Sequence, residues 1–96
     1  MAKVKWLPDA VDDFERLYFF LLDKDSGAAE NAAKNIIKGV YLLMVTPRIG
    51  KPMPDRDDRR ELFLALGAGA YVIRYRLEST QSVVIIRIWH NRENRD

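Results

Sequence analysis

His90, Arg92 and Arg95 are the residues whose types and spacing are best suited to chemistry in this chain. Histidine can act as a general acid or base near neutral pH, and arginines bind phosphate through paired hydrogen bonds. Together they could take a proton from a ribose 2′-hydroxyl and hold the scissile phosphate, which would cleave RNA. The more ordinary interpretation is a histidine at the end of a strand, followed by the charged residues of a tail.

The sequence lacks the residues that other common catalytic and metal-binding sites need. The chain has no cysteine and one histidine, so neither a thiolate site nor a zinc site within one chain is expected. Its three serines fall in turn-like segments, and the sequence has no glycine-rich phosphate loop. We therefore predict no metal and no cofactor, and favour a binding protein over an enzyme.

The composition predicts one globular domain over residues 1–96, with 48% hydrophobic and 31% charged residues. No apolar run is long enough to cross a bilayer, the N-terminus has no signal-peptide pattern, and the lack of cysteine suits a reducing compartment. We therefore expect a cytoplasmic protein without membrane association.

Positive charge is concentrated in the second half of the sequence. Residues 1–48 carry seven basic and seven acidic side chains, whereas residues 59–95 carry seven arginines against three glutamates, a net charge of +4. Arginine is well suited to two-point contacts with carboxylates and phosphates. This half of the chain therefore slightly favours an acidic partner.

The segment that must position His90 is predicted to be a strand over residues 82–89, rich in β-branched side chains. Because side chains alternate along a strand, Val84, Ile86 and Ile88 are expected to point into the core. The opposite set combines apolar residues with a cation and an aromatic residue: Val83, Ile85, Arg87 and Trp89. Such a face is costly to leave in water, which predicts that another molecule covers it.

Two helices are predicted before that strand. The first, Pro8–Leu22, has proline at its first position, aspartates where the helix dipole favours them, and apolar residues at helical spacing. The second runs over about residues 28–45 and ends before Pro47. Within it, Gly39 marks either a close crossing or a mild defect. Residues 23–27 form the turn of an antiparallel hairpin.

The remaining segments predict a sheet. Residues 60–66 and 71–77 alternate apolar and polar side chains and are joined by a glycine hairpin, while residues 3–6 form a short edge strand. Residues 47–58 are expected to be a connecting loop. The predicted fold is α+β: an N-terminal strand and an antiparallel two-helix hairpin packed on a C-terminal antiparallel β-sheet. The face away from the helices would carry Val72, Arg74, Arg76, Val83, Ile85, Arg87 and Trp89.

A family resemblance rests on three segments: Trp6-Leu-Pro-Asp-Ala-Val-Asp-Asp-Phe14, Tyr71-Val-Ile-Arg-Tyr-Arg76 and Ile85-Ile-Arg-Ile-Trp-His-Asn-Arg92. In this order they resemble the RelE/ParE superfamily, the toxins of type II toxin–antitoxin modules. The resemblance runs the full chain, including the helical hairpin, and implies the order of elements already predicted.

The resemblance implies one of two activities. RelE-like toxins cut mRNA on the ribosome with basic residues and often a C-terminal tyrosine; in that interpretation His90, Arg92 and Arg95 would be catalytic. Here, however, Val72 stands where those toxins commonly have arginine, and no tyrosine follows Tyr75. The His-Asn-Arg ending is more similar to ParE-like toxins, which poison DNA gyrase. The resemblance thus implies a gyrase inhibitor, whose target-binding residues would be Arg87, Trp89, His90, Arg92 and Arg95.

Either branch implies a cognate antitoxin. An acidic, amphipathic antitoxin segment that folds onto the basic sheet face would bury its apolar residues and pair with its arginines. The residues expected to bind it are Val72, Arg74, Arg76, Val83 and Ile85. In such modules, which stabilise plasmids or chromosomes, the complex would be a higher oligomer that binds operator DNA through the antitoxin. Outside the toxins, the alternative is an adaptor domain whose partner binds the same face.

Overall fold

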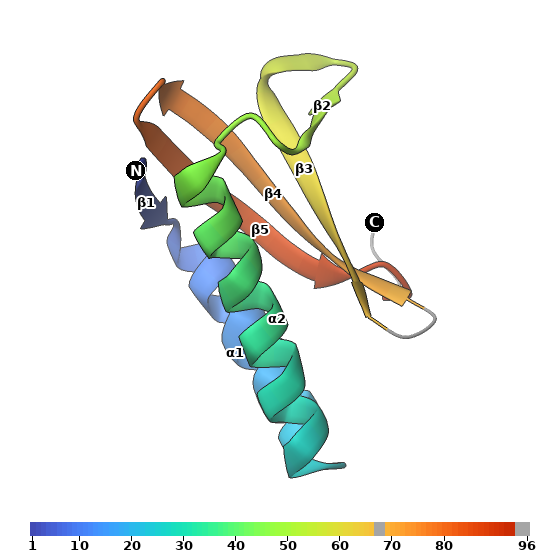
Figure 1. The fold of residues 1–96 in the computed structure, drawn as a ribbon. Helices are drawn as coiled ribbons and strands as arrows, with labels where there is room; N and C mark the ends of the chain where they lie inside the picture. The colour runs from blue at the N-terminus through green and yellow to red at the C-terminus, as the bar shows by residue number, and fades with distance from the viewer. Residues whose placement is uncertain (67–68, 94–96) are drawn as a thin grey trace.

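The protein folds as a helical hairpin on one face of a single sheet (Figure 1). The computed structural model describes residues 1–66 and 69–93, and only the backbone of residue 57. Strand β1 spans Lys3–Trp6, helix α1 Pro8–Leu22 and helix α2 Ser26–Val45. The later strands are β2 Lys51–Met53, β3 Arg56–Leu66, β4 Gly69–Ser79 and β5 Ser82–His90.

The sheet has five strands in the order β1-β5-β4-β3-β2. Neighbouring strands are antiparallel except that β1 runs parallel to β5 at one edge. The predicted α+β architecture and the N-terminal edge strand are therefore confirmed. Within the described ranges, no helix is long and apolar enough to span a membrane.

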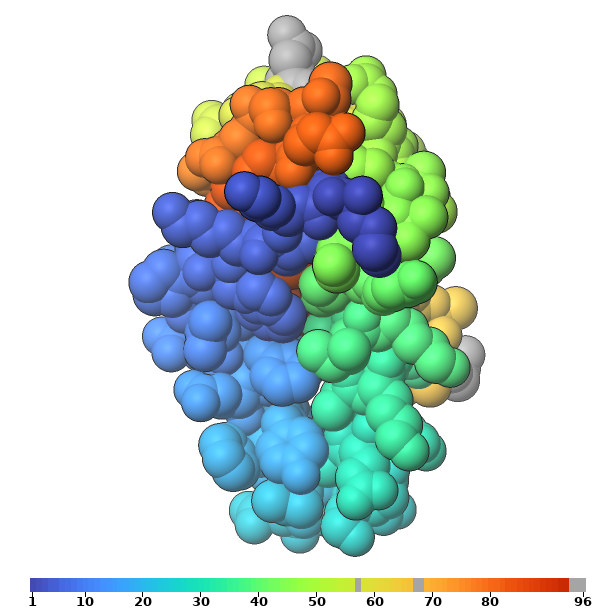
Figure 2. Space-filling view, turned by 60° about the vertical axis from the view of Figure 1, so that its left-hand side comes forward, coloured from blue at the N-terminus to red at the C-terminus, as the bar shows by residue number. Residues whose placement is uncertain are grey.

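The helices begin and end close to their predicted positions. Helix α1 starts at Pro8, as expected for a proline at the first helical position. Helix α2 starts earlier than predicted because Asp25 caps it, its Oδ1 accepting hydrogen bonds from the amides of Gly27 and Ala28 at 2.9 and 3.4 Å. Figure 2 shows the two helices side by side, with the N-terminal strand at one end of the pair.

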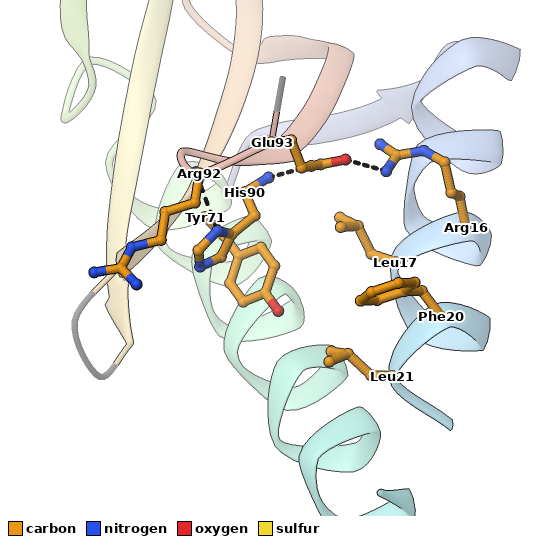
Figure 3. Close-up of a pocket in the computed structure, with 8 residues that line it drawn as sticks. All are labelled: Arg16, Leu17, Phe20, Leu21, Tyr71, His90, Arg92 and Glu93. Atoms are coloured by element: carbon orange, nitrogen blue, oxygen red, sulfur yellow. Dashed lines mark hydrogen bonds and ion pairs between the residues drawn. The ribbon is translucent and has the colours of Figure 1, made fainter. Parts of the chain in front are cut away.

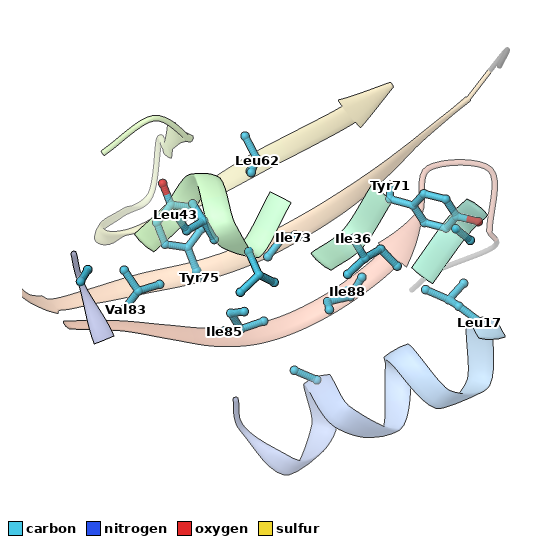
Figure 4. Packing of buried hydrophobic residues seen from close by; sticks show 14 residues of the cluster. Leu17, Ile36, Leu43, Leu62, Tyr71, Ile73, Tyr75, Val83, Ile85 and Ile88 are labelled. Carbon is cyan, nitrogen blue, oxygen red and sulfur yellow. The ribbon is translucent and has the colours of Figure 1, made fainter. Parts of the chain in front are cut away.

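Gly39 marks a close crossing between α2 and the sheet. It is buried, and a Cβ added there would lie 2.6 Å from Leu64 Cδ1 and 3.1 Å from Ile73 Cδ1. A larger residue would therefore require the side chains of Leu64 and Ile73, or the helix itself, to shift. The same face of α2 contributes Ile36 and Leu43 to the core, which lies between the helices and the sheet (Figure 4).

The predicted alternation of β5 is wrong in its first half. Val83 and Ile85 are fully buried in the core beneath the helices, and Ile88 also lies in the core, as predicted. The cause is a β-bulge: Arg74 pairs with Arg87 but the next residue, Tyr75, pairs with Ile85, so β5 has one extra residue there. Because of this extra residue, the side chains before the bulge point to the face opposite to the one that simple alternation predicts, whereas Ile88 after it points as predicted.

Val84 also lies on a different face of the sheet from the predicted one. It pairs with Arg76 of β4 and with Lys5 of β1, so it lies on the face away from the helices. It is nevertheless fully buried. The aliphatic stems of the flanking arginine and lysine are long enough to cover a valine side chain.

The segment predicted as a connecting loop, residues 47–58, is fastened to the sheet and contains strand β2. The hydroxyl of Tyr75 accepts a hydrogen bond from the Gly50 amide and donates one to the Pro47 carbonyl, both at 2.8 Å. Arg60 donates to the carbonyls of Arg48 and Gly50 at 3.0 and 2.7 Å. A Cβ on Gly50 would lie 2.5 Å from the Tyr75 hydroxyl, so this position leaves no room for a side chain.

Candidate functional site

The sheet face away from the helices is rich in arginine, and we call it the arginine face. Cross-strand partners share a face of a sheet, so the register of β3, β4 and β5 defines its members. They are Arg59, Glu61, Phe63, Val72, Arg74, Arg76, Val84, Arg87 and Trp89. Val72, Arg74, Arg76, Arg87 and Trp89 thus lie on the predicted face.

Several side chains of the arginine face bind one another and lie over the apolar residues of the sheet. Arg74 donates to Glu61 Oε2 through Nε and Nη2 at 2.9 and 2.8 Å, and its guanidinium lies 4.8 Å from the centre of the Trp89 ring. Val72 is buried beneath this layer. Phe63 is different, because 53% of its surface is exposed. The face is therefore organised around ion pairs, with one prominent apolar side chain.

Arg87 is held at the edge of this face by Asp13 of α1. Its Nε and Nη2 donate to Asp13 Oδ2 and Oδ1 at 2.7 and 3.1 Å, and the Ile88 amide donates to Oδ2 at 2.9 Å. Burial raises the pKa of Asp13, but these hydrogen bonds outweigh it and hold the pKa below its ordinary value. The bond to Asp13 in turn raises the pKa of the Arg87 guanidinium.

Polar contacts continue from Asp13 to the end of β5 through Arg16 and Glu93, and Figure 3 shows the part from Arg16 to His90. Arg16 approaches Asp13 at 3.4 Å through Nη2 and binds Glu93 Oε1 through Nη1. The other oxygen of Glu93 accepts the backbone N–H of His90 at 2.6 Å. The segment after β5 is therefore tied back to helix α1.

His90 lies on the helix side of the sheet, not on the arginine face. Its ring packs edge-on against Tyr71, with the ring centres 5.1 Å apart. Its Nδ1 accepts a hydrogen bond from the Arg92 amide at 3.2 Å, which places the proton of a neutral ring on Nε2. A Cβ added at Gly69 would lie 2.6 Å from Nε2, so that nitrogen packs against the backbone of β4.

A cavity of about 500 Å³ opens between α1 and the ends of β4 and β5. Its walls are apolar: Leu17, Phe20 and Leu21 from α1 face Tyr71 from β4 (Figure 3). Its mouth is polar, formed by Arg16, His90, Arg92 and Glu93. Burial, with a smaller effect from Glu93, raises the pKa of the Tyr71 hydroxyl, which therefore stays protonated at neutral pH. The cavity is therefore suited to an apolar group that has a polar group next to it.

The residues predicted to bind the target are divided between these two places. Arg87 and Trp89 belong to the arginine face, whereas His90 and Arg92 stand at the mouth of the cavity. Arg95 lies outside the described residues. The prediction that Val83 and Ile85 contact an antitoxin is wrong, because both side chains are 0% exposed and lie in the core.

Several residues of the site were missed from sequence. Asp13 was assigned to the helix dipole, although its carboxylate binds Arg87 and the Ile88 amide. Leu17, Phe20 and Leu21 form one wall of the cavity. From their spacing in the sequence we could predict only a wide apolar stripe on α1, not a cavity. One signal was available, since Phe19 and Phe20 are adjacent and cannot share a narrow buried face. Within the described residues, no cluster of acidic, histidine or cysteine side chains could hold a metal ion.

Comparisons with known proteins agree with this fold. Residues 4–95 match a family model described as the ParE toxin of type II toxin–antitoxin system, parDE. Toxin RelE1 of Caulobacter vibrioides is 36% identical over 83 residues, which cover 86% of each chain. Toxin RelE3 of the same organism is 33% identical over 95 residues, covering 99% of this chain and 100% of RelE3. In the chromosomal ParDE TA system from P. aeruginosa, a solved chain has the same fold with a TM-score of 0.69 at 22% identity, over 92% of this chain and 94% of that one.

The fold and the site define a small α+β domain with two surfaces suited to partners. The chain belongs to the ParE toxin family of type II toxin–antitoxin systems. It is a toxin of the ParE/RelE superfamily, and an antitoxin partner follows from that membership.

Proposed function

We propose that this toxin acts by binding DNA gyrase, thereby blocking replication, and that it does not cleave RNA. The observation that carries the proposal is the placement of His90. Its Nδ1 is occupied by the Arg92 amide and its Nε2 packs against the backbone at Gly69. A general base needs a free nitrogen lone pair, and in a neutral ring with this hydrogen bond the lone pair belongs to Nδ1, which already accepts the Arg92 amide.

The ion pairs of the sheet support the same conclusion. RNA cleavage needs guanidinium groups preorganised around the scissile phosphate. Here Arg87 is bound by Asp13 and Arg74 by Glu61. These contacts suit a rigid protein-binding surface, because Trp and Arg side chains dominate the energetics of many interfaces. We therefore assign target binding to the region at the end of β5, with Arg87, Trp89, His90, Arg92 and Arg95 as its residues.

Purified protein should inhibit the supercoiling of relaxed plasmid by gyrase, and added antitoxin should restore it. Trp89→Ala should reduce the inhibition at least about tenfold if this side chain is a main contact. Phe19→Ala is the matched control, since Phe19 is an exposed aromatic residue on α1 that does not line the cavity at the end of β5. Full supercoiling at every toxin concentration, with a folded and antitoxin-binding protein, would refute the gyrase assignment.

Ribosome-dependent mRNA cleavage is the second candidate. The observation that favours it is that His90 and Arg92 stand beside Arg16 at the mouth of one cavity, so a base and two cations do come together. Both similar toxins from Caulobacter vibrioides also carry the name RelE. In this candidate the catalytic residues would be His90, Arg92 and Arg95.

We further propose that an acidic segment of the antitoxin covers the arginine face, where Val72, Arg74 and Arg76 remain the candidate contacts. Arg59 faces Arg76 across the strands, and its buried Nε has no hydrogen-bond partner in the described part of the chain. A carboxylate from a partner, placed between the guanidinium groups of these two arginines, would offset their mutual repulsion. The complex would act in the cytoplasm as a higher oligomer that binds operator DNA through the antitoxin.

A further inference from the structure

Helix α2 leaves a row of apolar side chains exposed on its outer side. Ile37, Tyr41 and Val45 are 52%, 56% and 53% exposed, and Leu42 beside them is 41% exposed. Because Ile37, Tyr41 and Val45 recur every four residues, they lie one above the other along the helix. We call these residues, with Leu42, the α2 stripe. In the view of Figure 2, α2 lies beside α1 and no other segment covers its outer surface.

The inner side of the same part of α2 is already used by the core. Ile36, Val40 and Leu43 pack there against the sheet and α1. Lys38 is the only charged residue between positions 37 and 45. The second half of α2 is thus apolar on both sides, a pattern typical of a helix that is buried. A continuous exposed apolar surface of this kind indicates that another molecule covers it.

The spacing along α2 fits a second helix as the covering element. Lys34, Ile37, Tyr41 and Met44 follow one another in steps of three and four residues, the pattern by which two helices pack side by side. The first of these positions is polar and the others are apolar. The seam is therefore asymmetric along the helix, and its partner must match that asymmetry.

Opposite charges stand at the two ends of this seam. Glu30 precedes it and Arg48 follows the end of α2 at Val45, and both side chains are exposed. In the described part of the chain neither side chain forms an ion pair. If a second copy packs antiparallel with its Tyr41 opposite Ile37, the same spacing brings Glu30 opposite Arg48 of that copy. A parallel pair would instead place like charges together, so the charges favour the antiparallel arrangement.

A shallow hollow of about 360 Å³ on α2 can receive Tyr41 of the second copy. It is lined by Ala33, Lys34, Ile37 and Lys38, within about two turns before Tyr41. The aliphatic stems of the two lysines can pack against the aromatic ring, and their ammonium groups are attracted to its face. A two-fold axis makes each such contact occur twice.

We propose that the α2 stripe is the interface of a toxin homodimer, in which the α2 helices of two copies pack antiparallel. Ile37 of each copy contacts Tyr41 of the other, and Glu30 pairs with Arg48 at both ends. A helix of this length offers a surface only about 30 Å long, smaller than the interface of a permanent dimer, so the dissociation constant should be on the order of 10 µM. The arginine face lies on the opposite side of the sheet and stays open in each copy.

Sedimentation equilibrium of the full-length toxin, free of its antitoxin, measures the dimer directly. Tyr41→Glu should weaken dimerisation roughly 30-fold or more, because it places two carboxylates in an apolar contact. Phe19→Glu is the matched control, since Phe19 is an aromatic residue on α1 with 60% exposure, outside the α2 stripe. It should change the dissociation constant less than about threefold, with circular dichroism showing that both variants are folded.

Exchanging the charges at the ends of the seam tests the antiparallel arrangement. Glu30→Arg and Arg48→Glu should each weaken dimerisation about tenfold, because each substitution places like charges together at both ends. The double variant restores opposite charges, so its dissociation constant should return to within about threefold of the wild-type value. A double variant as weak as the single ones would refute the pairing of these two residues.

Crosslinking gives an independent readout, since the chain has no cysteine of its own. A mixture of the Glu30→Cys and Arg48→Cys variants should be joined by a short bismaleimide. Glu30→Cys alone should not, because the antiparallel dimer holds the two copies of that position about 27 Å apart. Crosslinks between two copies of position 30 would contradict the proposed arrangement.

Two further results would overturn the dimer itself. One is a monomer at concentrations well above the expected dissociation constant. The other is equal dimerisation of Tyr41→Glu and Phe19→Glu, which would place the contact elsewhere. Binding of the monomer to anionic lipid vesicles would then identify the α2 stripe as a membrane-binding surface. None of these measurements involves gyrase, so they decide the role of α2 even if the gyrase assignment fails.

Discussion

Asp13 and Arg87, 74 residues apart in sequence, form a two-point ion pair that fastens helix α1 to the edge of β5. Strand β1 pairs with β5 only as far as Ile85, and the Asp13 carboxylate accepts the amide of Ile88 farther along the same strand. A buried side chain thus replaces a missing strand partner there. The contact also fixes the position of α1, which forms one wall of the cavity.

Asp13→Asn should lower the free energy of unfolding by about 1–3 kcal/mol, because the buried Asp13 carboxylate no longer binds Arg87 and the Ile88 amide, while Arg87, whose side chain is 36% exposed, can be hydrated in its place. Asp12→Asn is the control, since Asp12 is exposed on the same helix turn and should change stability by less than about 0.5 kcal/mol. Urea unfolding followed by circular dichroism measures both. Equal stability of the two variants would show that the pair contributes nothing to the fold.

The pH dependence of the free energy of unfolding should reflect the protonation of the Asp13 carboxylate. Its pKa is lower in the folded protein than its ordinary value of 3.8, so the ionised carboxylate stabilises the fold above that value. This contribution is lost as the pH falls through the lowered pKa. The difference in unfolding free energy between the wild type and Asp13→Asn should therefore stay constant from about pH 7 to about pH 5 and shrink below about pH 4. A difference that grows on acidification would contradict this account.

The elements that sequence predicted well are those with local signals. Pro8 sets the start of α1, and Pro47 follows the end of α2 at Val45. Strand β3 was recognisable because its leucines alternate with other residues, and Leu62 is buried while Phe63 is exposed. Such signals depend on neighbours a few residues apart, and they were sufficient for the order of elements.

The sequence-based predictions failed where the structure depends on a residue that is distant in the sequence. The run Val83-Val-Ile-Ile86 is apolar at every position, so its alternation indicates no face and gives no sign of the bulge. Strand β2 contains Pro52, which is tolerated because β2 lies at the edge of the sheet. The partner of Asp13 lies at the other end of the chain, and no local pattern identifies it.

Tyr75→Phe should loosen the segment at residues 47–50. The substitution removes the acceptor of the buried Gly50 amide and the donor to the Pro47 carbonyl. Leaving a buried amide unpaired costs about 1–3 kcal/mol, and hydrogen exchange of the Gly50 amide should accelerate accordingly. Tyr41→Phe is the control, because Tyr41 is 56% exposed on α2. Unchanged protection of the Gly50 amide would refute the role of the hydroxyl.

Reversing two charges on the arginine face should weaken the antitoxin complex. In the double variant Arg74→Glu and Arg76→Glu, like charges would face an acidic antitoxin segment, and such juxtaposition costs several kcal/mol. The control is Lys34→Glu with Lys38→Glu, which makes the same change of net charge on the exposed surface of α2. Titration calorimetry should show a large loss of affinity for the first pair and little for the second. Unchanged affinity with the fold intact would place the antitoxin elsewhere.

The most direct test of the central claim is primer-extension mapping of mRNA on translating ribosomes, with wild-type toxin and the His90→Ala variant. If His90 is a packed side chain at the edge of a binding site, both proteins leave the mRNA uncut at concentrations at which the wild type stops gyrase. If the wild type instead makes cuts at defined codon positions and His90→Ala abolishes them, His90 is a catalytic base, and the toxin is a ribonuclease.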